Sequence, residues 1–137
     1  MKEKNEAKYT IYMTRARRSI VIIEDDASQQ KALRLALEKE GFEVHAAMNG
    51  KEGIELVHVQ KPDIIFCDVI MPVMTGIEAL EHFRADALIR DIPVFVLTNY
   101  ALHEKVMPLL DLKKDRFFLK TDSSLKQIIA EINTILS

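Results

Sequence analysis

Four short apolar segments of this chain each end at polar residues of the kind that phosphoryl-transfer chemistry uses. In chain order these residues are two acids, a third acid, a hydroxyl and a lysine, namely Glu24 and Asp25, Asp68, Thr98, and Lys120. Carboxylate oxygens are the ligands that a hard cation such as Mg²⁺ prefers, and hydroxyl and ammonium groups donate hydrogen bonds to phosphoryl oxygens. The four segments together predict a divalent metal site, a phosphate acceptor, a hydroxyl donor and a cation.

Each of these residues has a simpler explanation when it is taken alone. An apolar strand must end at some polar residue, and acids favour the start of a helix. A lone threonine or lysine at a strand end serves as a cap or as a solvated side chain. Asp26 is interpreted in this simpler way, as a charge at a helix start. The functional interpretation depends on the whole set occurring in one chain, so it requires a fold that brings the four segments together.

The elements that must position these residues alternate between strand-like and helix-like patterns. Short apolar runs, typical of strands buried on both faces, predict strands at residues 20–23, 64–67, 94–97 and 116–119, and residues 42–47 are predicted to form a further strand. Apolar residues at helical spacing predict five helices, around residues 32–37, 54–57, 76–83, 102–110 and 125–136. Five such βα units predict an α/β fold, with a doubly wound five-stranded parallel sheet and helices on both faces. Right-handed crossovers then place the C-terminal ends of all strands at one edge, where ligands bind.

Local signals predict two further details of the helices. Asp122 or Ser123 is the predicted N-cap of the last helix, since either side chain can accept a hydrogen bond from a free backbone N–H. Pro108 lies inside the helix predicted at residues 102–110. Because proline lacks the backbone N–H and its ring clashes with the preceding turn, this helix is predicted to be kinked or shortened.

Length and composition describe one ordinary globular domain. A chain of 137 residues, 48% of them apolar and 29% charged, can form one core but is too short for two. No apolar stretch reaches the roughly 18 residues of a membrane span, and the N-terminus lacks the apolar core of a secretion signal. The single cysteine, Cys67, suits a reducing compartment, and its place beside Asp68 on a strand predicts a buried, inert thiol. The expected location is the cytoplasm.

The N-terminal residues differ in charge from the rest of the chain. Residues 1–18 carry six Lys and Arg against two Glu, whereas residues 19–137 carry thirteen Lys and Arg against nineteen Asp and Glu. The resulting formal net charges of +4 and −6 predict a flexible basic extension at 1–18 and one folded domain at 19–137. Such an extension either touches nucleic acid or an acidic partner or is simply solvated.

The combination of motifs resembles the receiver domain of two-component response regulators, in its stand-alone, chemotaxis-regulator-like form. The resemblance comprises the acidic pair, the Asp-x-x-Met-Pro-x-x-x-Gly segment from Asp68 to Gly76, Thr98 and Lys120. Thr98 lies thirty residues after Asp68 and Lys120 lies fifty-two residues after it, as in the family, and the resemblance extends over residues 19–136. It implies the flavodoxin-like receiver fold.

The resemblance also implies a role for each residue of the set. The implied ligands of Mg²⁺ or Mn²⁺ are the side chains of Glu24, Asp25 and Asp68 and the backbone carbonyl of Ile70. Asp68 is the implied phosphoacceptor, and Thr98 and Lys120 would contact phosphoryl oxygens. Phe117, three residues before the lysine, would follow Thr98 inward as part of the switch. Asn99 stands where the family has a smaller residue, so it is expected to border the phosphoryl group and to narrow access to it.

By the same resemblance, the protein is a signalling phosphoprotein, and the only reactions it catalyses are its own phosphorylation and dephosphorylation. A histidine kinase or a histidine phosphotransfer protein is the expected phosphoryl donor. An unknown downstream protein is the expected partner of the changed output face. The sequence ends one residue after the last apolar helical position, so we expect no direct DNA binding, the alternative being that this sequence is a fragment of a longer regulator. We also expect no membrane contact and a monomer or weak dimer.

Two other classes of function stay open. A pseudo-receiver would keep the fold as an interaction module without control by phosphorylation, and three departures from the family pattern leave room for it, namely Asn99, Pro108 and Thr121. Thr121 stands where the family has a proline after a cis bond. A cis bond before threonine costs about 2.5–4 kcal/mol, so the state of this bond and the orientation of Lys120 are open. A phosphohydrolase of the haloacid dehalogenase type needs a second Asp two positions after the first, where Ile70 lies.

Overall fold

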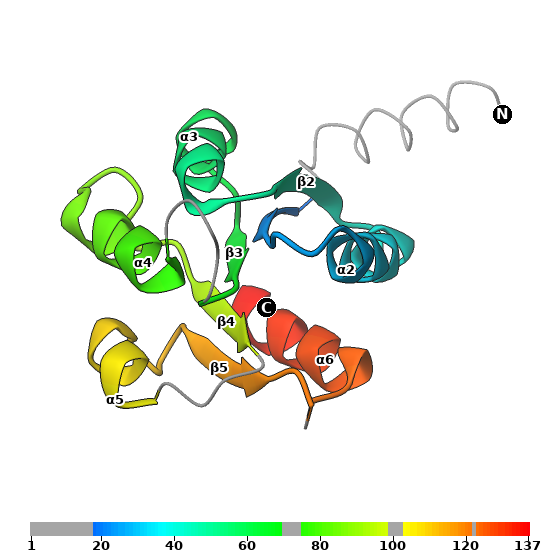
Figure 1. The fold of residues 1–137 in the computed structure, drawn as a ribbon. Helices are drawn as coiled ribbons and strands as arrows, with labels where there is room; N and C mark the ends of the chain where they lie inside the picture. The colour runs from blue at the N-terminus through cyan, green and yellow to red at the C-terminus, as the bar shows by residue number, and fades with distance from the viewer. Residues whose placement is uncertain (1–17, 70–74, 99–102, 122) are drawn as a thin grey trace, which may run out of the picture.

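The computed structural model describes residues 18–69, 75–98, 103–121 and 123–137. Five parallel strands form one sheet in the order β2-β1-β3-β4-β5 (Figure 1). The strands are β1 (Ser19–Ile23), β2 (Glu43–Ala47), β3 (Ile64–Cys67), β4 (Val94–Thr98) and β5 (Arg116–Leu119). This arrangement confirms the predicted α/β fold, because every strand is parallel to its neighbours and a helical segment follows each strand.

Helices cover both faces of the sheet. They are α2 (Ala27–Lys39), α3 (Gly50–Gln60), α4 (Gly76–Ala85), α5 (His103–Val106), the 3₁₀ helix η1 (Met107–Leu109) and α6 (Leu125–Leu136). Figure 1 shows α2 and α6 on one side of the sheet and α3, α4 and α5 on the other. The core is divided in the same way, with one apolar cluster under each group of helices. In the described part of the chain, no helix is long and apolar enough to cross a membrane.

Strand β1 explains why the strands appear in the sequence as continuous apolar runs. Ile20 and Ile22 pack in the cluster under α2 and α6, whereas Val21 and Ile23 pack in the cluster under α3, α4 and α5. All four side chains are almost fully buried. Because side chains alternate between the faces of a strand, a strand covered on both faces has no position left for a polar residue until it ends.

The predicted cap of the last helix was wrong. The N-cap of α6 is Ser124, whose Oγ accepts a hydrogen bond from the backbone N–H of Gln127 at 3.2 Å. The side chain of Gln127 in turn accepts a bond from the backbone N–H of Ser124 at 3.0 Å. This reciprocal capping box satisfies two backbone donors, which Ser123 cannot do because a lysine, Lys126, stands three residues after it. Asp122 lies outside the described residues.

The helix starts and ends explain two other sequence predictions. Asp26 is the N-cap of α2, and its Oδ1 accepts a hydrogen bond from the backbone N–H of Gln29 at 3.0 Å. The predicted helix around Pro108 is indeed short, since α5 has 4 residues and is followed by the 3-residue η1. Pro108 lies in the first positions of η1, where its missing N–H is tolerated.

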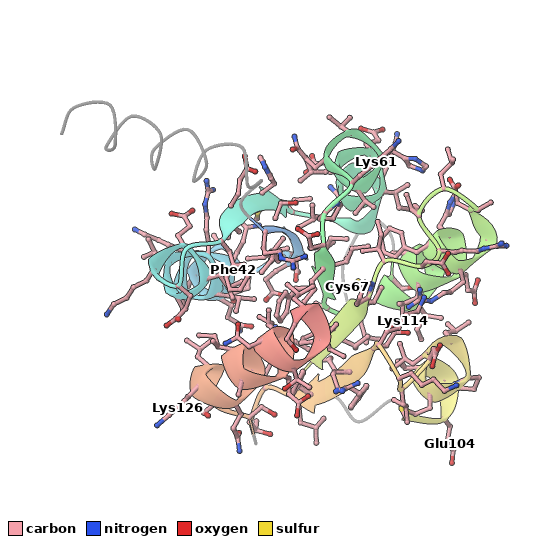
Figure 2. All side chains as sticks on the ribbon, turned by 180° about the vertical axis from the view of Figure 1, so that it is seen from behind. Phe42, Lys61, Cys67, Glu104, Lys114 and Lys126 are labelled. Carbon is pink, nitrogen blue, oxygen red and sulfur yellow. The ribbon has the colours of Figure 1, made fainter. Side chains whose placement is uncertain are left out.

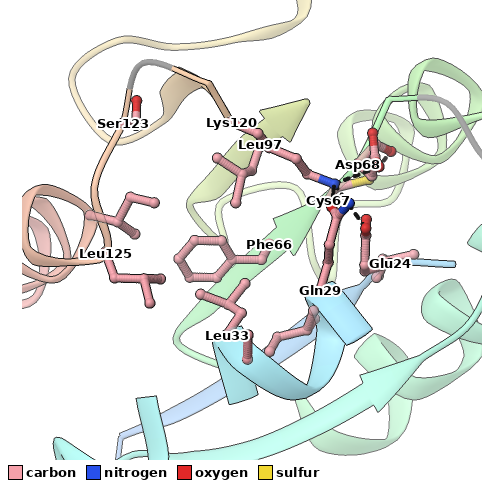
Figure 3. Close-up of a pocket in the computed structure, with 14 residues that line it drawn as sticks. Glu24, Gln29, Leu33, Phe66, Cys67, Asp68, Leu97, Lys120, Ser123 and Leu125 are labelled. Atoms are coloured by element: carbon pink, nitrogen blue, oxygen red, sulfur yellow. Dashed lines mark hydrogen bonds and ion pairs between the residues drawn. The ribbon is translucent and has the colours of Figure 1, made fainter. Parts of the chain in front are cut away.

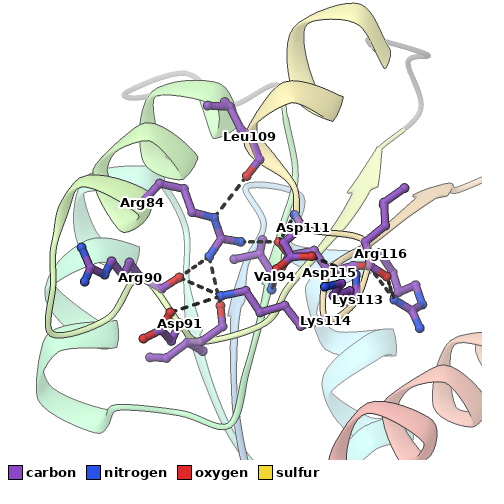
Figure 4. Close-up of polar contacts among 12 residues, drawn as sticks. Arg84, Arg90, Asp91, Val94, Leu109, Asp111, Lys113, Lys114, Asp115 and Arg116 are labelled. Carbon is purple, nitrogen blue, oxygen red and sulfur yellow. Dashed lines mark hydrogen bonds and ion pairs between the residues drawn. The ribbon is translucent and has the colours of Figure 1, made fainter.

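A buried ion pair joins several segments at the edge of the sheet where β4 and β5 begin (Figure 4). The carboxylate of Asp115, which is 0% exposed, accepts hydrogen bonds from Arg84 Nη2 at 2.7 Å and from the backbone N–H of Val94 at 2.7 Å and of Asp111 at 2.8 Å. Arg84 also donates to the carbonyl oxygen of Leu109 at 3.2 Å. The pair thus connects the end of α4, the start of β4, the end of η1 and the loop before β5. Sequence analysis did not identify it.

Figure 2 shows how the charged side chains are distributed around this core. Lys126 on α6, Glu104 on α5 and Lys61 after α3 point away from the sheet, whereas Cys67 lies in its interior. Cys67 is 1% exposed, which confirms the predicted burial. Burial raises the pKa of its thiol, and the charges of Asp68 and Glu24 add to this effect. Burial and the raised pKa both disfavour the reactive thiolate.

Candidate functional site

The predicted site residues lie together where the strands end. Backbone hydrogen bonds continue the sheet by one residue, because the N–H of Glu24 donates to the carbonyl of Ala47 at 3.1 Å and the N–H of Asp68 donates to the carbonyl of Ile23 at 3.0 Å. The N–H of Lys120 donates to the carbonyl of Thr98 at 2.8 Å. Their side chains therefore start from one ordered edge of the sheet, as the topology predicts.

The ammonium group of Lys120 lies between two carboxylates (Figure 3). Its Nζ donates to Glu24 Oε1 at 2.8 Å and to Asp68 Oδ2 at 3.0 Å, and it also donates to Gln29 Oε1. The side chain of Lys120 is 15% exposed, and those of Glu24 and Asp68 are 7% and 11% exposed. The structure thus joins three residues that lie up to 96 positions apart in the sequence.

Three carboxylates of this edge can share one metal ion. One oxygen from each of Glu24, Asp25 and Asp68 lies within 4.8 Å of the other two. Mg²⁺ binds oxygen ligands at about 2.0–2.1 Å in an octahedral arrangement, so oxygen atoms this close together need only small side-chain movements to become ligands. Glu24 and Asp68 are largely buried and Asp25 is partly exposed, which leaves one side of the cluster open to water ligands.

The electrostatics of the cluster also suit a cation. Burial raises the pKa of Glu24 to about 8, and Asp68 acts in the same direction through a hydrogen bond and its negative charge, whereas Lys120 opposes both. For Lys120, burial alone would lower the pKa, but its hydrogen bonds to Glu24 and Asp68 and their charges raise it. Lys120 therefore stays charged, but its one ammonium group does not offset the burial and the Asp68 charge that disfavour the ionised form of Glu24. A divalent cation at this place would favour the ionised form.

Gly76 lets the start of α4 pack directly on the backbone of Asp68. Its N–H donates to the carbonyl of Val69 at 2.7 Å. A Cβ atom at this position would lie 2.0 Å from the carbonyl oxygen of Asp68 and 2.6 Å from Val69 Cα. The side chain of Thr75 caps the helix by accepting a hydrogen bond from the N–H of Glu78 at 3.2 Å. The glycine of the motif is therefore required by a close approach of two backbone segments.

We expect Gly76→Ala to lower the free energy of unfolding by about 1–3 kcal/mol, since overpacking forces the backbone to shift. Gly53→Ala is the comparison variant, because the atoms nearest to its new Cβ belong to the side chain of Ile23, whereas those at Gly76 belong to the backbone. Urea unfolding of both variants measures the difference. A Gly76→Ala variant as stable as Gly53→Ala would contradict the close approach.

The two predicted switch residues share one face of the sheet. Thr98 is 0% exposed, and Phe117 is partly buried against the cluster under α3, α4 and α5. Thr98 pairs with Leu119 and Val96 pairs with Phe117. By strand alternation, Thr98 and Phe117 therefore point to the same side. A coupled movement of the two side chains requires such a shared face. The switch roles of Thr98 and Phe117 remain predictions.

Several sequence predictions are not tested by the geometry. Ile70 and Asn99 lie outside the described residues, so the predicted metal contact of the first and the predicted phosphoryl contact of the second stay predictions. Among the described residues, which include Lys120 and Thr121, no peptide bond is cis. The side chain of Lys120 reaches Asp68 with threonine in this position.

Two glutamines of α2 belong to the site and were missed in the sequence. Gln29 accepts a hydrogen bond from Lys120. The amide Nε2 of Gln30 donates to the carbonyl oxygens of Glu24 at 3.0 Å and Ala47 at 3.1 Å. One feature of the sequence could have pointed to them. A helix that starts at Asp26, directly after β1, has Gln29 and Gln30 in its first turn, close to the strand ends. Glutamine is too common on exposed helix surfaces for that signal to suggest a site by itself.

An apolar cavity of about 370 Å³ lies beside Lys120, between α2 and α6 (Figure 3). Its apolar walls come from both helices and the sheet and include Leu33, Phe66, Leu97, Leu125 and Ile128. Its polar lining includes Glu24, Gln29, Asp68, Lys120 and Ser123. The cavity therefore opens directly onto the ammonium group of Lys120 and its acceptors.

Comparisons with known proteins agree with this architecture. The family model for the response regulator receiver domain matches residues 20–133. Protein PilH of Pseudomonas aeruginosa is 35% identical over 80 residues, which are 58% of this chain and 66% of PilH. The polar-differentiation response regulator DivK of Brucella anthropi is 32% identical over 85 residues, which are 62% of this chain and 69% of DivK. The chain thus matches about two thirds of the length of each of these relatives.

Solved structures show the same fold. The chemotaxis protein CheY4 of Vibrio cholerae superimposes with a TM-score of 0.76, covering 88% of this chain and 99% of CheY4, at 21% sequence identity. At that identity the similarity concerns the fold alone. It confirms the predicted flavodoxin-like receiver fold, and the family model confirms the resemblance found in the sequence.

Proposed function

Because the chain belongs to the response regulator receiver domain family of two-component signalling, we propose that it is a switch controlled by phosphorylation of Asp68. The observation that carries this proposal is the placement of Lys120, whose ammonium group bonds to Asp68 at 3.0 Å inside a cluster of acids. A phosphoacceptor needs such a cation beside it, because the phosphoryl group brings nearly two negative charges.

In the proposed reaction, a carboxylate oxygen of Asp68 attacks phosphorus. The bond from phosphorus to the donor breaks, its electron pair leaves with the donor, and an acyl phosphate forms. Lys120 offsets the charge on the phosphoryl oxygens, and the hydroxyl of Thr98 donates a hydrogen bond to one of them. A Mg²⁺ ion bound by Glu24, Asp25 and Asp68, with Mn²⁺ as an alternative, would supply further charge neutralisation.

The proposed output is a change on the face formed by α5 and β5. A charge-assisted hydrogen bond from Thr98 to the phosphoryl group contributes about 1.5–3 kcal/mol, enough to shift a two-state equilibrium by roughly tenfold to a hundredfold. Phe117 points to the same face as Thr98, so it can move into space that Thr98 leaves. The short α5 and η1 give this face its particular shape, which a downstream protein would recognise.

The proposed phosphoryl donor is a histidine kinase or a histidine phosphotransfer protein, in keeping with the family. We place the protein in the cytoplasm, because its one cysteine is a buried free thiol and its composition is that of an ordinary globular domain. The proposed activity is limited to its own phosphorylation and dephosphorylation.

Treatment with acetyl phosphate and Mg²⁺ tests the proposed function. Intact-protein mass spectrometry should show a gain of one phosphoryl unit, and a chelator added beforehand should prevent it. Absence of any gain with acetyl phosphate and with a panel of histidine kinases would favour an interaction module without phosphorylation. A gain that persists in the presence of the chelator would remove the metal from the proposal.

Mg²⁺ alone is expected to stabilise the protein. A ligand that binds only the folded state raises its stability by about 2.7 kcal/mol at a hundredfold excess over its Kd. The melting temperature should therefore rise with Mg²⁺ in the wild type and much less in Asp25→Asn. Asp26→Asn is the matched control, because Asp26 caps α2 and asparagine is an equally good cap. An equal rise in the wild type and in Asp25→Asn would place the ion elsewhere.

A further inference from the structure

Lys120 has a third partner besides the two carboxylates, and this partner is a neutral side chain. An ammonium group has three N–H donors. Nζ of Lys120 bonds to Glu24, Asp68 and Gln29, so its three donors match three acceptors. Phosphorylation of Asp68 would bring three strong acceptor oxygens to the same place and would turn the attacking carboxylate oxygen into a bridging oxygen. Lys120 would then move its bond from Asp68 to a phosphoryl oxygen, and this shift of the ammonium group works against its bonds to Glu24 and Gln29.

The bonds to Glu24 and Gln29 are unequal. The side chain of Glu24 is 7% exposed, and a buried polar group that loses its hydrogen-bond partner is destabilised. Gln29 is a neutral acceptor on the exposed side of α2. Water can replace Lys120 at this exposed amide, so breaking the bond leaves no buried group unpaired. The bond to Gln29 is therefore the easier one to give up.

The first turn of α2 holds Gln29 in reach of Lys120. The backbone N–H of Gln29 donates a hydrogen bond to Oδ1 of Asp26 at 3.0 Å, which caps the helix. The next residue, Gln30, ties the same turn to the ends of β1 and β2 through the carbonyls of Glu24 and Ala47. The cavity between α2 and α6 borders both Gln29 and Lys120 (Figure 3), so the two side chains have space in which to separate.

We propose that Gln29 is a positioning residue that holds Lys120 in the resting state and gives way to a phosphoryl oxygen when Asp68 is phosphorylated. This inference rests on the proposed function of the site. Gln29 does not touch the phosphoryl group. It competes with that group for the ammonium group of Lys120, and it therefore slows phosphorylation. Because it is already displaced once the acyl phosphate exists, it has no effect on hydrolysis.

Acetyl phosphate labelling of Gln29 variants in the presence of Mg²⁺ tests this competition. Gln29→Leu removes the acceptor and should raise the phosphorylation rate about three- to tenfold, the effect of one modest hydrogen bond. Gln29→Asn keeps the amide but is one methylene shorter, so it should behave like Gln29→Leu. Gln29→Glu adds a charged competitor and should fall below the wild type. The decay rate of the phosphorylated protein, measured after removal of acetyl phosphate, should stay the same in all four proteins.

Ser28→Glu is the matched control for charge, because it adds a carboxylate in the same exposed turn of α2, one residue before the partner of Lys120. It should slow phosphorylation less than Gln29→Glu does. Equal slowing by both variants would assign the effect to charge alone and overturn the competition.

Two outcomes separate this inference from the proposed function. If the wild type gains no phosphoryl unit, the proposed function itself fails. If the wild type is phosphorylated but Gln29→Leu and Gln29→Asn are labelled no faster, the competition is wrong and the proposed function stands. Faster labelling together with an equal change in the decay rate would also overturn the inference, because it would indicate a general change of the site.

Discussion

An Asp68→Asn variant is expected to gain no phosphoryl unit from acetyl phosphate, whereas the wild type gains one. Asparagine has nearly the same shape as aspartate, but its amide cannot act as the attacking carboxylate. The site around it should remain in place, because the pair between Lys120 and Glu24 at 2.8 Å does not involve position 68. Intact-protein mass spectrometry measures the loss, and circular dichroism shows that the variant is folded.

Asp26→Asn is the control for this experiment as well. Asp26 lies at the same edge of the sheet but serves as the N-cap of α2, and asparagine keeps that cap. It should be phosphorylated at the rate of the wild type. An undiminished mass gain in Asp68→Asn would show that another residue is the acceptor. If neither Asp68→Asn nor Asp26→Asn gained mass, the removal of any negative charge at this edge would be enough to prevent phosphorylation.

Replacement of Asp115 by alanine is expected to lower the free energy of unfolding by about 3–5 kcal/mol, the effect of removing one partner from a buried ion pair. The carboxylate of Asp115 is 0% exposed and accepts three hydrogen bonds, from Arg84 and from the backbone N–H groups of Val94 and Asp111. Without it, the guanidinium of Arg84 keeps carbonyl acceptors such as Leu109 but loses its carboxylate partner. The two backbone N–H groups lose their side-chain acceptor.

Asp91→Ala is the matched control, since Asp91 is an acid of the same region that pairs with Lys114 at 3.7 Å and is 91% exposed. Its loss should cost less than about 1 kcal/mol, as expected for an exposed ion pair. Urea unfolding of both variants measures the contrast. A loss of less than about 1 kcal/mol in Asp115→Ala as well would mean that solvent or a rearranged side chain satisfies Arg84, and that the network is not a support of the fold.

The network around Asp115 also bears on the proposed switch. It holds the start of β4 and the end of η1, whereas Thr98 and Phe117 lie farther along β4 and β5. One end of each strand is thus held by a buried ion pair, and the other end reaches the proposed phosphorylation site. In the proposed switch, a displacement of Thr98 would therefore move the C-terminal ends of β4 and β5, while their first residues stay in place.

The sequence by itself determined the α/β class, the five strands and the edge at which the acids, Thr98 and Lys120 meet. It could do so because strands buried on both faces have no polar residue until they end, as β1 shows up to Glu24. Parallel strands with right-handed connections then leave only one edge for all such ends. The sequence also predicted the short helix near Pro108, because proline has no backbone N–H and its ring clashes with the preceding helical turn.

Only the tertiary structure decided which polar side chains contact one another. Gln29, Arg84 and Asp115 resemble ordinary surface residues in the sequence, because their partners lie 91, 31 and 31 positions away, respectively. The cap at Ser124 depended on a choice among neighbouring residues with similar propensities, which the side chain of Gln127 settled. Apolar periodicity reports burial, whereas hydrogen-bond partners depend on distances of a few ångströms between segments far apart in the chain. Packing alone sets those distances.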